Sequence, residues 1–385
     1  MIQEFFLLDI TFFHINGRTE GVMNKKTVKL GVVGLRRGLI AKYLVKYDTV
    51  ELCAICDKSE QALEKAMSEI RDEQKKSGKD YPVARFSSFD KLIGSDIDAV
   101  YIATGADSHV PYVIQAMESG KHVISEVPAI ASVEEARELK ACVKAHPELK
   151  YMLAENCLYW AFLETWRQMY RDGMLGEAVY AEGSYLHGMD WMKKDPSKIN
   201  KDHWRHNYPA IKYLTHSLGP ILDITDDRCV SVTCMIPDVE YDPNSDKTRN
   251  GVALFKTEKG AVIRILIVFG AYSGYSHRYM IVGTAGSVEN DPVKPLEEAY
   301  SYASMRSVDG SIYRKLEIPV TLMAEGEEET RGRGEIKMLR EFISCILNDT
   351  PSPIDADKAI DMSLPGIIAY ESALRGGELL AVPKI

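Results

Sequence analysis

The stretch Lys29-Leu-Gly-Val-Val-Gly-Leu-Arg-Arg-Gly-Leu-Ile40 decides the expected fold, because a short apolar strand breaks into glycines there and restarts as a helix. Its glycines stand where a chain turns tightly and lets another backbone or a phosphate approach. We expect the helix to begin near Gly38 and to point backbone N–H groups and the positive end of its dipole at the gap, which suits a pyrophosphate. The expected contacts to a dinucleotide are Gly31, Gly34, Leu35, Arg36, Arg37 and Gly38.

The next expected strand, residues 50–56, ends in Asp57, about 20 residues beyond the glycines. A carboxylate there hydrogen-bonds a ribose diol and repels a 2′-phosphate, which favours NAD over NADP. Arg36 replaces the second glycine of the usual G-x-G-x-x-G pattern, so its side chain either avoids the pyrophosphate or contacts it. An isolated glycine motif can also be a plain structural turn, but the order of strand, glycines, helix, strand and terminal acid favours a bound dinucleotide.

Composition narrows the classes of partner. The 385 residues exceed the roughly 250 to 300 at which single cores stop growing, so two domains are expected. A net charge of −9 argues against nucleic acid or an anionic membrane as partner and leaves a small molecule. Seven scattered cysteines, an odd number, are typical of a reducing compartment and predict a cytoplasmic protein. Residues 1–24 are expected to form an N-terminal extension without signal-peptide features, and residues 1–22 either belong to the protein or precede its native start at Met23.

From Val28 to Ala154 short apolar runs alternate with helical patterns. Such alternation predicts a parallel sheet covered on both faces, here an NAD-binding Rossmann domain over residues 25–154. Ligands bind beyond the carboxyl ends of such strands. The residues expected to line this crevice are Thr104, His109, Glu126, Pro128, Glu155 and Asn156. The alternative for His109 is packing at a helix start.

After Ala154 the pattern changes to one helix, residues 161–172, followed by strands. The expected strands are residues 178–185, 230–235, 252–256, 261–269 and 278–282, with a hairpin turn at 258–260. We expect a C-terminal α/β domain, residues 155–385, with a large, mostly antiparallel open sheet. Its last helices, residues 335–347 and 355–375, should pack back on the first domain. An open sheet face favours a homo-oligomer, either a dimer or a tetramer.

Two tyrosine–histidine pairs carry the expected chemistry. Tyr185 and His187 are two apart on a strand, so their side chains leave the same face. Tyr213 and His216 are three apart, at the start of a helix that we expect Thr215 to cap. A histidine in the first helical turn has its protonated form disfavoured by the dipole and is available as a base. The alternative is that these aromatic side chains only edge a half-buried sheet.

A set of landmarks is spread along the chain: the Gly31 turn, Asp57, Ala103-Thr104 with His109, Gly120-Lys-His-Val123 leading to Glu126 and Pro128, and Gly176-Glu177. Together they resemble the Gfo/Idh/MocA oxidoreductase family over residues 28–375. The resemblance implies a Rossmann domain, an α/β sheet domain, a tightly held NAD(P), and sugar or polyol substrates oxidised at a ring hydroxyl. Two positions depart from the family: its Glu-Lys-Pro lysine is Val127, and the aspartate before the helix histidine is Lys212. The proton-transfer set of the simple dehydrogenases is therefore incomplete. Lys212 is either a replacement cation or a solvated surface lysine.

Further motifs resemble the family's NAD-dependent α-N-acetylgalactosaminidase branch. They are Glu126-Val-Pro128, Glu155-Asn156 with Tyr159, Glu182 to His187, Trp204-Arg205, and Tyr213 to Pro220. By position, the resemblance implies active-site roles for Glu155, Tyr185, His187, Tyr213 and His216. In that branch NAD⁺ takes a hydride from the sugar C3, the C2 proton leaves with expulsion of the C1 group, water adds, and the hydride returns.

We therefore expect an NAD-dependent hydride-transfer enzyme that oxidises the C3 hydroxyl of a sugar or glycoside, with elimination and redox-neutral cleavage. The alternative is a simple NAD-dependent sugar or polyol dehydrogenase that releases NADH, and a third possibility is a non-catalytic NAD or sugar sensor. No metal is expected, because His187, Asp190, Glu155 and His216 match no compact ligand motif.

Overall fold

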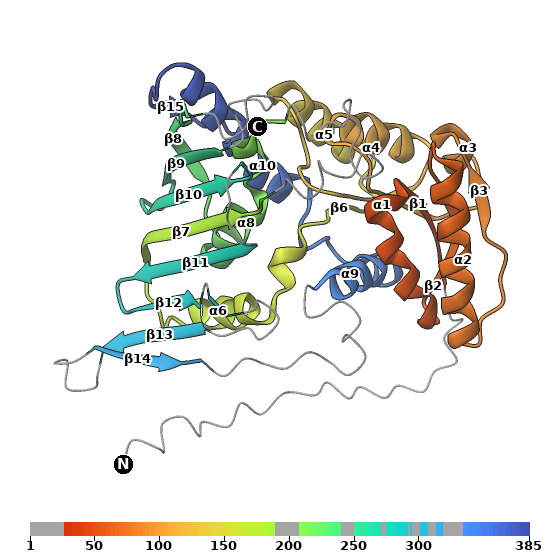
Figure 1. Cartoon of the computed structure of the whole chain (residues 1–385), viewed down its shortest axis with the longest axis horizontal. Coiled ribbons are helices and arrows are strands. Elements are labelled where there is room, and N and C mark those ends of the chain that lie inside the picture. Colours follow the sequence, from red (N-terminus) through yellow and green to blue (C-terminus); the bar gives the residue numbers. More distant parts are fainter. Residues whose placement is uncertain are drawn as a thin grey trace, which may run out of the picture.

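The computed structural model describes residues 27–188, 208–239, 250–270, 275–291, 293–294, 301–306, 313–318 and 334–385. The expected N-terminal extension lies outside the described residues, as do the Trp204-Arg205 motif and Asp190. Two sheets organise the described part, and the chain passes from one to the other after β6 (Figure 1).

The first sheet is parallel throughout and has the strand order β3-β2-β1-β4-β5-β6. Its strands are β1 (Val28–Val33), β2 (Val50–Cys56), β3 (Ala84–Phe86), β4 (Ala99–Ile102), β5 (His122–Ser125) and β6 (Tyr151–Leu153). The central β4 is buried along its whole length, as expected of a strand with both faces covered.

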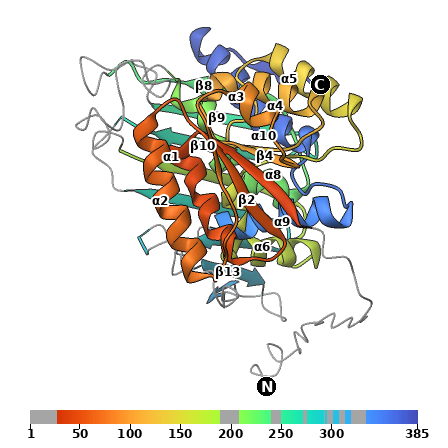
Figure 2. The ribbon, with the colours of Figure 1, turned by 90° about the vertical axis from the view of Figure 1, so that its right-hand side faces the viewer.

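Helices lie on both faces of this sheet. Figure 2 shows α1 and α2 to one side of it and α4 and α5 to the other. The helices are α1 (Leu35–Gly38), η1 (Leu39–Lys46), α2 (Glu60–Lys76), α3 (Phe89–Ile93), η2 (Ala106–Ser108), α4 (His109–Glu118) and α5 (Val133–Ala145). The expected parallel α/β sheet is confirmed.

The glycine turn differs from its prediction in one respect. The helix begins at Leu35, directly after Gly34, and not near Gly38. Gly34 makes this possible because its φ of +85° turns the chain, and a Cβ there would lie 2.4 Å from the Ala103 carbonyl oxygen. Gly38 lies inside the helical segment instead, where a Cβ would stand 2.5 Å from Val32 Cγ1, so its role is close packing of helix on strand.

The second sheet has nine strands in the order β14-β13-β12-β11-β7-β10-β9-β8-β15. They are β7 (Ala178–Leu186), β8 (Cys229–Met235), β9 (Asn250–Thr257), β10 (Val262–Val268), β11 (Ser276–Gly283), β12 (Gly286–Asn290), β13 (Ser301–Arg306), β14 (Tyr313–Glu317) and β15 (Leu380–Ala381). All neighbours are antiparallel except β7 and β10, so the expected mostly antiparallel sheet and its β9–β10 hairpin are confirmed. The strands β12 to β15, and β3 of the first sheet, were not predicted from the sequence, because short strands with mixed polarity give a weak periodic signal.

Among the described residues, helices cover one face of the second sheet and the other face is open. The helices α6 (Ala161–Arg171), α8 (Thr215–Thr225) and α10 (Ala356–Leu374) pack on the covered face. On the open face the apolar side chains of Val252, Leu254 and Val262 are between 37% and 45% exposed. The helix α9 (Glu335–Asn348) crosses back and contacts η1 and β1 of the first sheet (Figure 1).

Candidate active site

A histidine and a buried carboxylate meet where the two sheets join. Glu155 follows β6 and begins the short helix η3 (Asn156–Tyr159), and it is 0% exposed. His216 lies in the first turn of α8, and its Nδ1 is 2.7 Å from Glu155 Oε1. Because a carboxylate only accepts hydrogen bonds, Nδ1 donates, which leaves Nε2 as the nitrogen able to accept a proton.

Two details of this pair differ from the sequence expectation. Thr215 does not cap α8, because the helix starts one residue earlier, with Leu214 at the N-cap. The Thr215 hydroxyl is buried and finds no hydrogen-bond partner among the described residues. The second detail is the contact itself, because only the helix was considered for His216, whereas its ring Nδ1 lies 2.7 Å from the Glu155 carboxylate.

Cys157 completes a small cluster with this pair. Its backbone N–H donates to Glu155 Oε1 at 3.1 Å, and its Sγ lies 3.4 Å from His216 Nδ1. The oxygen, sulfur and nitrogen atoms lie within 4.8 Å of one another, a set that could hold a cation. Burial raises the pKa of the Cys157 thiol well above its usual value, and the Glu155 carboxylate adds to this effect, which disfavours a reactive thiolate.

The two expected tyrosine–histidine pairs converge on one another. The ring of His216 lies 5.2 Å from that of Tyr213 and 5.7 Å from that of Tyr185, both edge to face. The ring of His187 is 5.5 Å from that of Tyr185. Tyr213 and Tyr185 are only 5% and 8% exposed, so both are largely shielded from solvent. Phe269, after β10, contacts both tyrosines.

His277, on β11, was not predicted from the sequence as a site residue. It is 2% exposed, stands opposite Tyr185 in the β7–β11 register, and stacks on the Tyr185 ring at 4.1 Å with an angle of 22° between the planes. Tyr279, two residues on, donates its hydroxyl hydrogen to the His216 carbonyl oxygen. A signal was present, because Tyr275-x-His277 repeats the spacing of Tyr185-x-His187.

The residues expected to hold a dinucleotide gather at the carboxyl ends of the parallel strands. Asp57 follows β2, and its Oδ2 accepts the Leu35 N–H at 2.8 Å, so the carboxylate lies beside the glycine turn. Its Oδ1 accepts the Ser59 N–H at 2.9 Å. The Gly34 turn and the Asp57 carboxylate thus stand together as a nucleotide site requires, and they fit NAD.

Glu126, after β5, is engaged by protein partners. Its Oε1 accepts hydrogen bonds from the Tyr101 hydroxyl and from Arg37 Nε, the latter at 2.8 Å. Arg37 Nη1 also lies 3.3 Å from Glu335 Oε1 at the start of α9. Burial alone would raise the pKa of Glu126, but Arg37 reverses this effect and holds the pKa below its usual value. The sequence analysis did not foresee this network, in which Arg37 ties the glycine turn to α9.

His109 links the loop after β4 to the loop after β5. It is buried, with Nδ1 at 2.8 Å from the Pro128 carbonyl oxygen and Nε2 at 3.3 Å from that of Thr104. Burial lowers its pKa. The structure therefore gives His109 a packing position from which it orients the β4 and β5 loops. Asn156 is also buried, next to Glu155.

Lys212 is half-buried and is not a solvated surface lysine. Its ammonium group lies over the Tyr370 ring of α10, 5.0 Å from the centroid, and burial lowers its pKa. The structure gives no support to the expectation that it replaces the missing cation.

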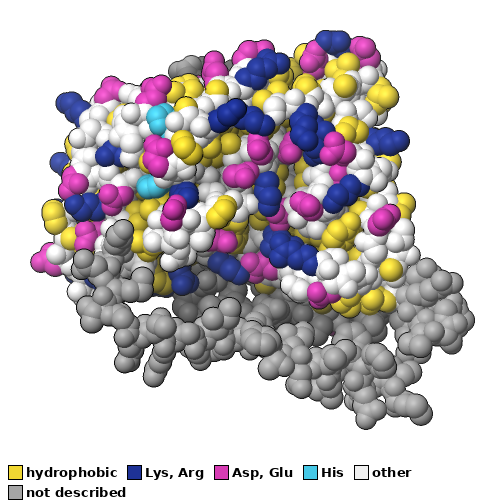
Figure 3. All heavy atoms as spheres, turned by 180° about the vertical axis from the view of Figure 1, so that it is seen from behind, with side chains coloured by type: hydrophobic (Ala, Val, Ile, Leu, Met, Phe, Trp, Pro, Cys, Tyr) yellow, Lys and Arg dark blue, Asp and Glu magenta, His cyan; other side chains and the backbone are white. Residues whose placement is uncertain are grey.

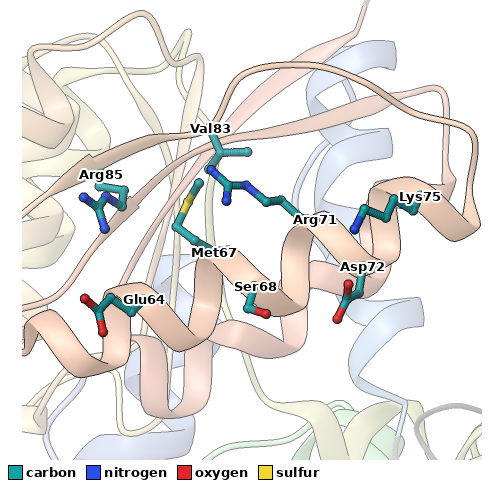
Figure 4. Close-up of a pocket in the computed structure, with 8 residues that line it drawn as sticks. All are labelled: Glu64, Met67, Ser68, Arg71, Asp72, Lys75, Val83 and Arg85. Atoms are coloured by element: carbon teal, nitrogen blue, oxygen red, sulfur yellow. The ribbon is translucent and has the colours of Figure 1, made fainter.

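The charged surface and a pocket of the described part lie outside the His216 cluster. Figure 3 shows basic and acidic side chains intermixed over the face it draws. A pocket of about 680 Å³ is lined by side chains of α2, most of them charged, and by Val83 and Arg85 at the β3 edge (Figure 4). It shares no residue with the His216 cluster.

Models of known protein families match the residues of both sheets. Residues 28–153 match a model described as an oxidoreductase family with an NAD-binding Rossmann fold, and residues 163–289 match the Gfo/Idh/MocA C-terminal domain. A glycosyl hydrolase family 109 protein of Shewanella pealeana is 28% identical, over 90% of this chain and 82% of its own. The glycosyl hydrolase family 109 protein 3 of Phocaeicola vulgatus is 30% identical, over 89% of this chain and 70% of its own.

Solved structures share the fold. Scyllo-inositol dehydrogenase from Lactobacillus casei, with bound NAD(H) and scyllo-inositol, has a TM-score of 0.73 at 21% identity, and the match covers 93% of this chain and 99% of that one. Levoglucosan dehydrogenase in complex with NADH has a TM-score of 0.76 at 18% identity, covering 94% and 100%. Within the described residues, no helix has the length and apolar character needed to cross a membrane.

Proposed function

The chain belongs to the Gfo/Idh/MocA oxidoreductase family of NAD-binding enzymes, and from this premise we propose that it oxidises the C3 hydroxyl of a sugar glycoside and cleaves the glycoside with no net redox change. The observation that carries the proposal is the buried Glu155–His216 pair, flanked by the rings of Tyr213 and Tyr185. The relatives named glycosyl hydrolase family 109 support the cleavage step, and the sugar and polyol dehydrogenases with the same fold support the substrate class.

The cofactor site in this proposal is formed by the glycine turn and Asp57. The Gly34 turn lets the pyrophosphate approach the backbone, and the Asp57 carboxylate takes the ribose diol. Thr104, Asn156 and the backbone near Pro128 line the same crevice. When bound, NAD⁺ supplies the hydride acceptor for C3 and later returns the hydride.

His216 acts as the base for the C3 hydroxyl. Its Nε2 takes the hydroxyl proton as the hydride departs, while Glu155 holds the ring through Nδ1 and stabilises the positive charge that the ring acquires. Tyr213 lies at the edge of the His216 ring, where its hydroxyl can orient the same sugar oxygen. This arrangement performs alcohol oxidation without the lysine of the simple dehydrogenases, whose position is taken by the buried Val127.

Tyr185 and His187 transfer protons at C2 and at the oxygen on C1. The C3 ketone makes the C2 proton acidic, so one of these side chains removes it, and the C2–H electrons form a C1–C2 double bond as the C1–O bond breaks. The other side chain protonates the departing oxygen. Water then adds at C1 and a proton returns to C2, which restores the sugar skeleton before C3 is reduced again.

The test offers the purified protein, with NAD⁺, a panel of aryl glycosides while aglycone release and NADH absorbance are followed together. Aglycone release without accumulation of NADH, with solvent deuterium entering at C2, is the expected result. Accumulation of NADH with the glycoside intact would make the protein a simple dehydrogenase, and binding without turnover would make it a sensor. The His216→Gln variant should lose aglycone release, whereas Glu164→Gln, which removes an ion pair with Lys337 outside the cluster, should not.

The open sheet face supports a proposal about assembly. We propose that the apolar side chains of Val252, Leu254 and Val262 face a second copy of the chain, in a dimer or a tetramer. Sedimentation of the purified protein tests this assembly.

A further inference from the structure

Three buried carboxylates surround the place where the glycine turn, η3 and α9 meet. Glu126, Glu155 and Glu335 are 7%, 0% and 4% exposed and come from three different elements. Figure 1 shows α9, which carries Glu335, between the two sheets and beside α1. Glu126 and Glu335 share Arg37 as an ion-pair partner. Glu155 accepts the Cys157 N–H, and both Glu155 and Glu335 help to raise the pKa of the Cys157 thiol, which links the third carboxylate to the other two.

The positive charge in this region falls short of the negative charge. In the part of the chain that the structure describes, Arg37 is the one permanent cation that forms an ion pair with these carboxylates, and its side chain is 37% exposed. His216 pairs with Glu155 and is charged only when protonated. Two carboxylate oxygens, Glu155 Oε2 and Glu335 Oε2, are buried without a hydrogen-bond partner among the described residues. Buried carboxylates with unpartnered oxygens are costly unless a cation is bound nearby.

The cofactor can supply this missing charge in only one of its two redox states. The nicotinamide ring carries a positive charge in NAD⁺ and none in NADH, whereas the remainder of the molecule is the same in both. The ring must meet the sugar carbon whose hydroxyl His216 serves, so it shares the space of this cluster. This step rests on the proposed function, which places the chemistry at His216.

We propose that Glu126, Glu155 and Glu335 form a buried anionic cluster that selects the oxidised cofactor, so that the enzyme binds NAD⁺ more tightly than NADH. Such a preference serves a redox-neutral reaction, because each turnover must begin and end with NAD⁺ in the site. Glu335 contributes to this preference through its charge, because α9, which carries it, holds none of the residues assigned to the sugar.

The test measures the dissociation constants of NAD⁺ and NADH by calorimetry, on the full chain freed of cofactor and without any sugar. The wild-type protein should bind NAD⁺ at least about tenfold more tightly than NADH, which defines the affinity ratio. Glu335→Gln should reduce that ratio about fivefold or more, the size of effect expected of one charge across a partly buried site. Glu335→Asp, which retains the charge, should keep most of the ratio. Glu164→Gln is the matched control. It also removes a carboxylate, and the partner of that carboxylate, Lys337, lies on α9 as Glu335 does.

Equal affinity for the two redox states in the wild-type protein would overturn the proposal, and so would the same ratio in Glu335→Gln as in Glu164→Gln. If Glu335→Gln does not fold, Glu155→Gln provides the second charge removal and should also lower the ratio. Because no sugar is present, failure of glycoside cleavage leaves this measurement unaffected, and the two proposals can fail separately.

Discussion

Replacing Glu155 by glutamine tests the site most directly. The change keeps the shape of the side chain but removes the charge 2.7 Å from His216 Nδ1. A hydrogen bond to a charged group is worth roughly 1.5 to 3 kcal/mol and a neutral one roughly 0.5 to 1.5, so its weakening alone should slow turnover about tenfold. If the amide instead donates to Nδ1, the ring proton moves to Nε2 and the base is lost, so we expect kcat to fall by about 10² to 10⁴.

The same variant should not be less stable than the wild-type protein. Glu155 Oε2 is buried and has no hydrogen-bond partner among the described residues, so removal of the charge relieves an unfavourable burial. The assay therefore pairs steady-state kinetics on an aryl glycoside with urea unfolding. KM should change little, since Glu155 acts through His216. A kcat within about threefold of the wild-type value, in a folded variant, would refute the assignment of Glu155 and His216 as a working pair.

Three further predictions follow from single contacts. His277→Ala should lower kcat about tenfold by removing the ring stacked on Tyr185, and His277→Phe should recover most of it; equal losses in both would contradict a positioning role. Gly34→Ala should lower the free energy of unfolding by more than about 2 kcal/mol, measured in urea, because of its positive φ and the approach of Ala103. Burial lowers the pKa of His109 from 6.5, so the folded state binds fewer protons and stability should fall as the pH drops below about 6.5. Urea unfolding between about pH 7.5 and 5 should show a smaller loss of stability at low pH in His109→Gln than in the wild-type protein. The same pH dependence of stability in both proteins would contradict the prediction.

Local pattern was enough for most of the fold. Alternating apolar runs predicted the parallel sheet, and period-two patterns predicted β7 to β11, because burial on one or both faces of a strand leaves a signal within a few residues. The same reasoning was wrong about where the first helix begins, because the positive φ of Gly34 and its approach to Ala103 are features of the folded chain.

The candidate site shows where sequence reasoning stops. By itself the sequence determined the order of the elements, the glycine turn with Asp57, and the residues that follow each strand, Glu155 and Glu126 among them. Only the tertiary structure decided that Glu155 holds His216, 61 residues away, that His277 stacks on Tyr185, and that Glu335 reaches Arg37 across 298 residues. The physical reason is that periodicity reports which face of an element is buried, whereas the partner it meets depends on how the two sheets and α9 pack together.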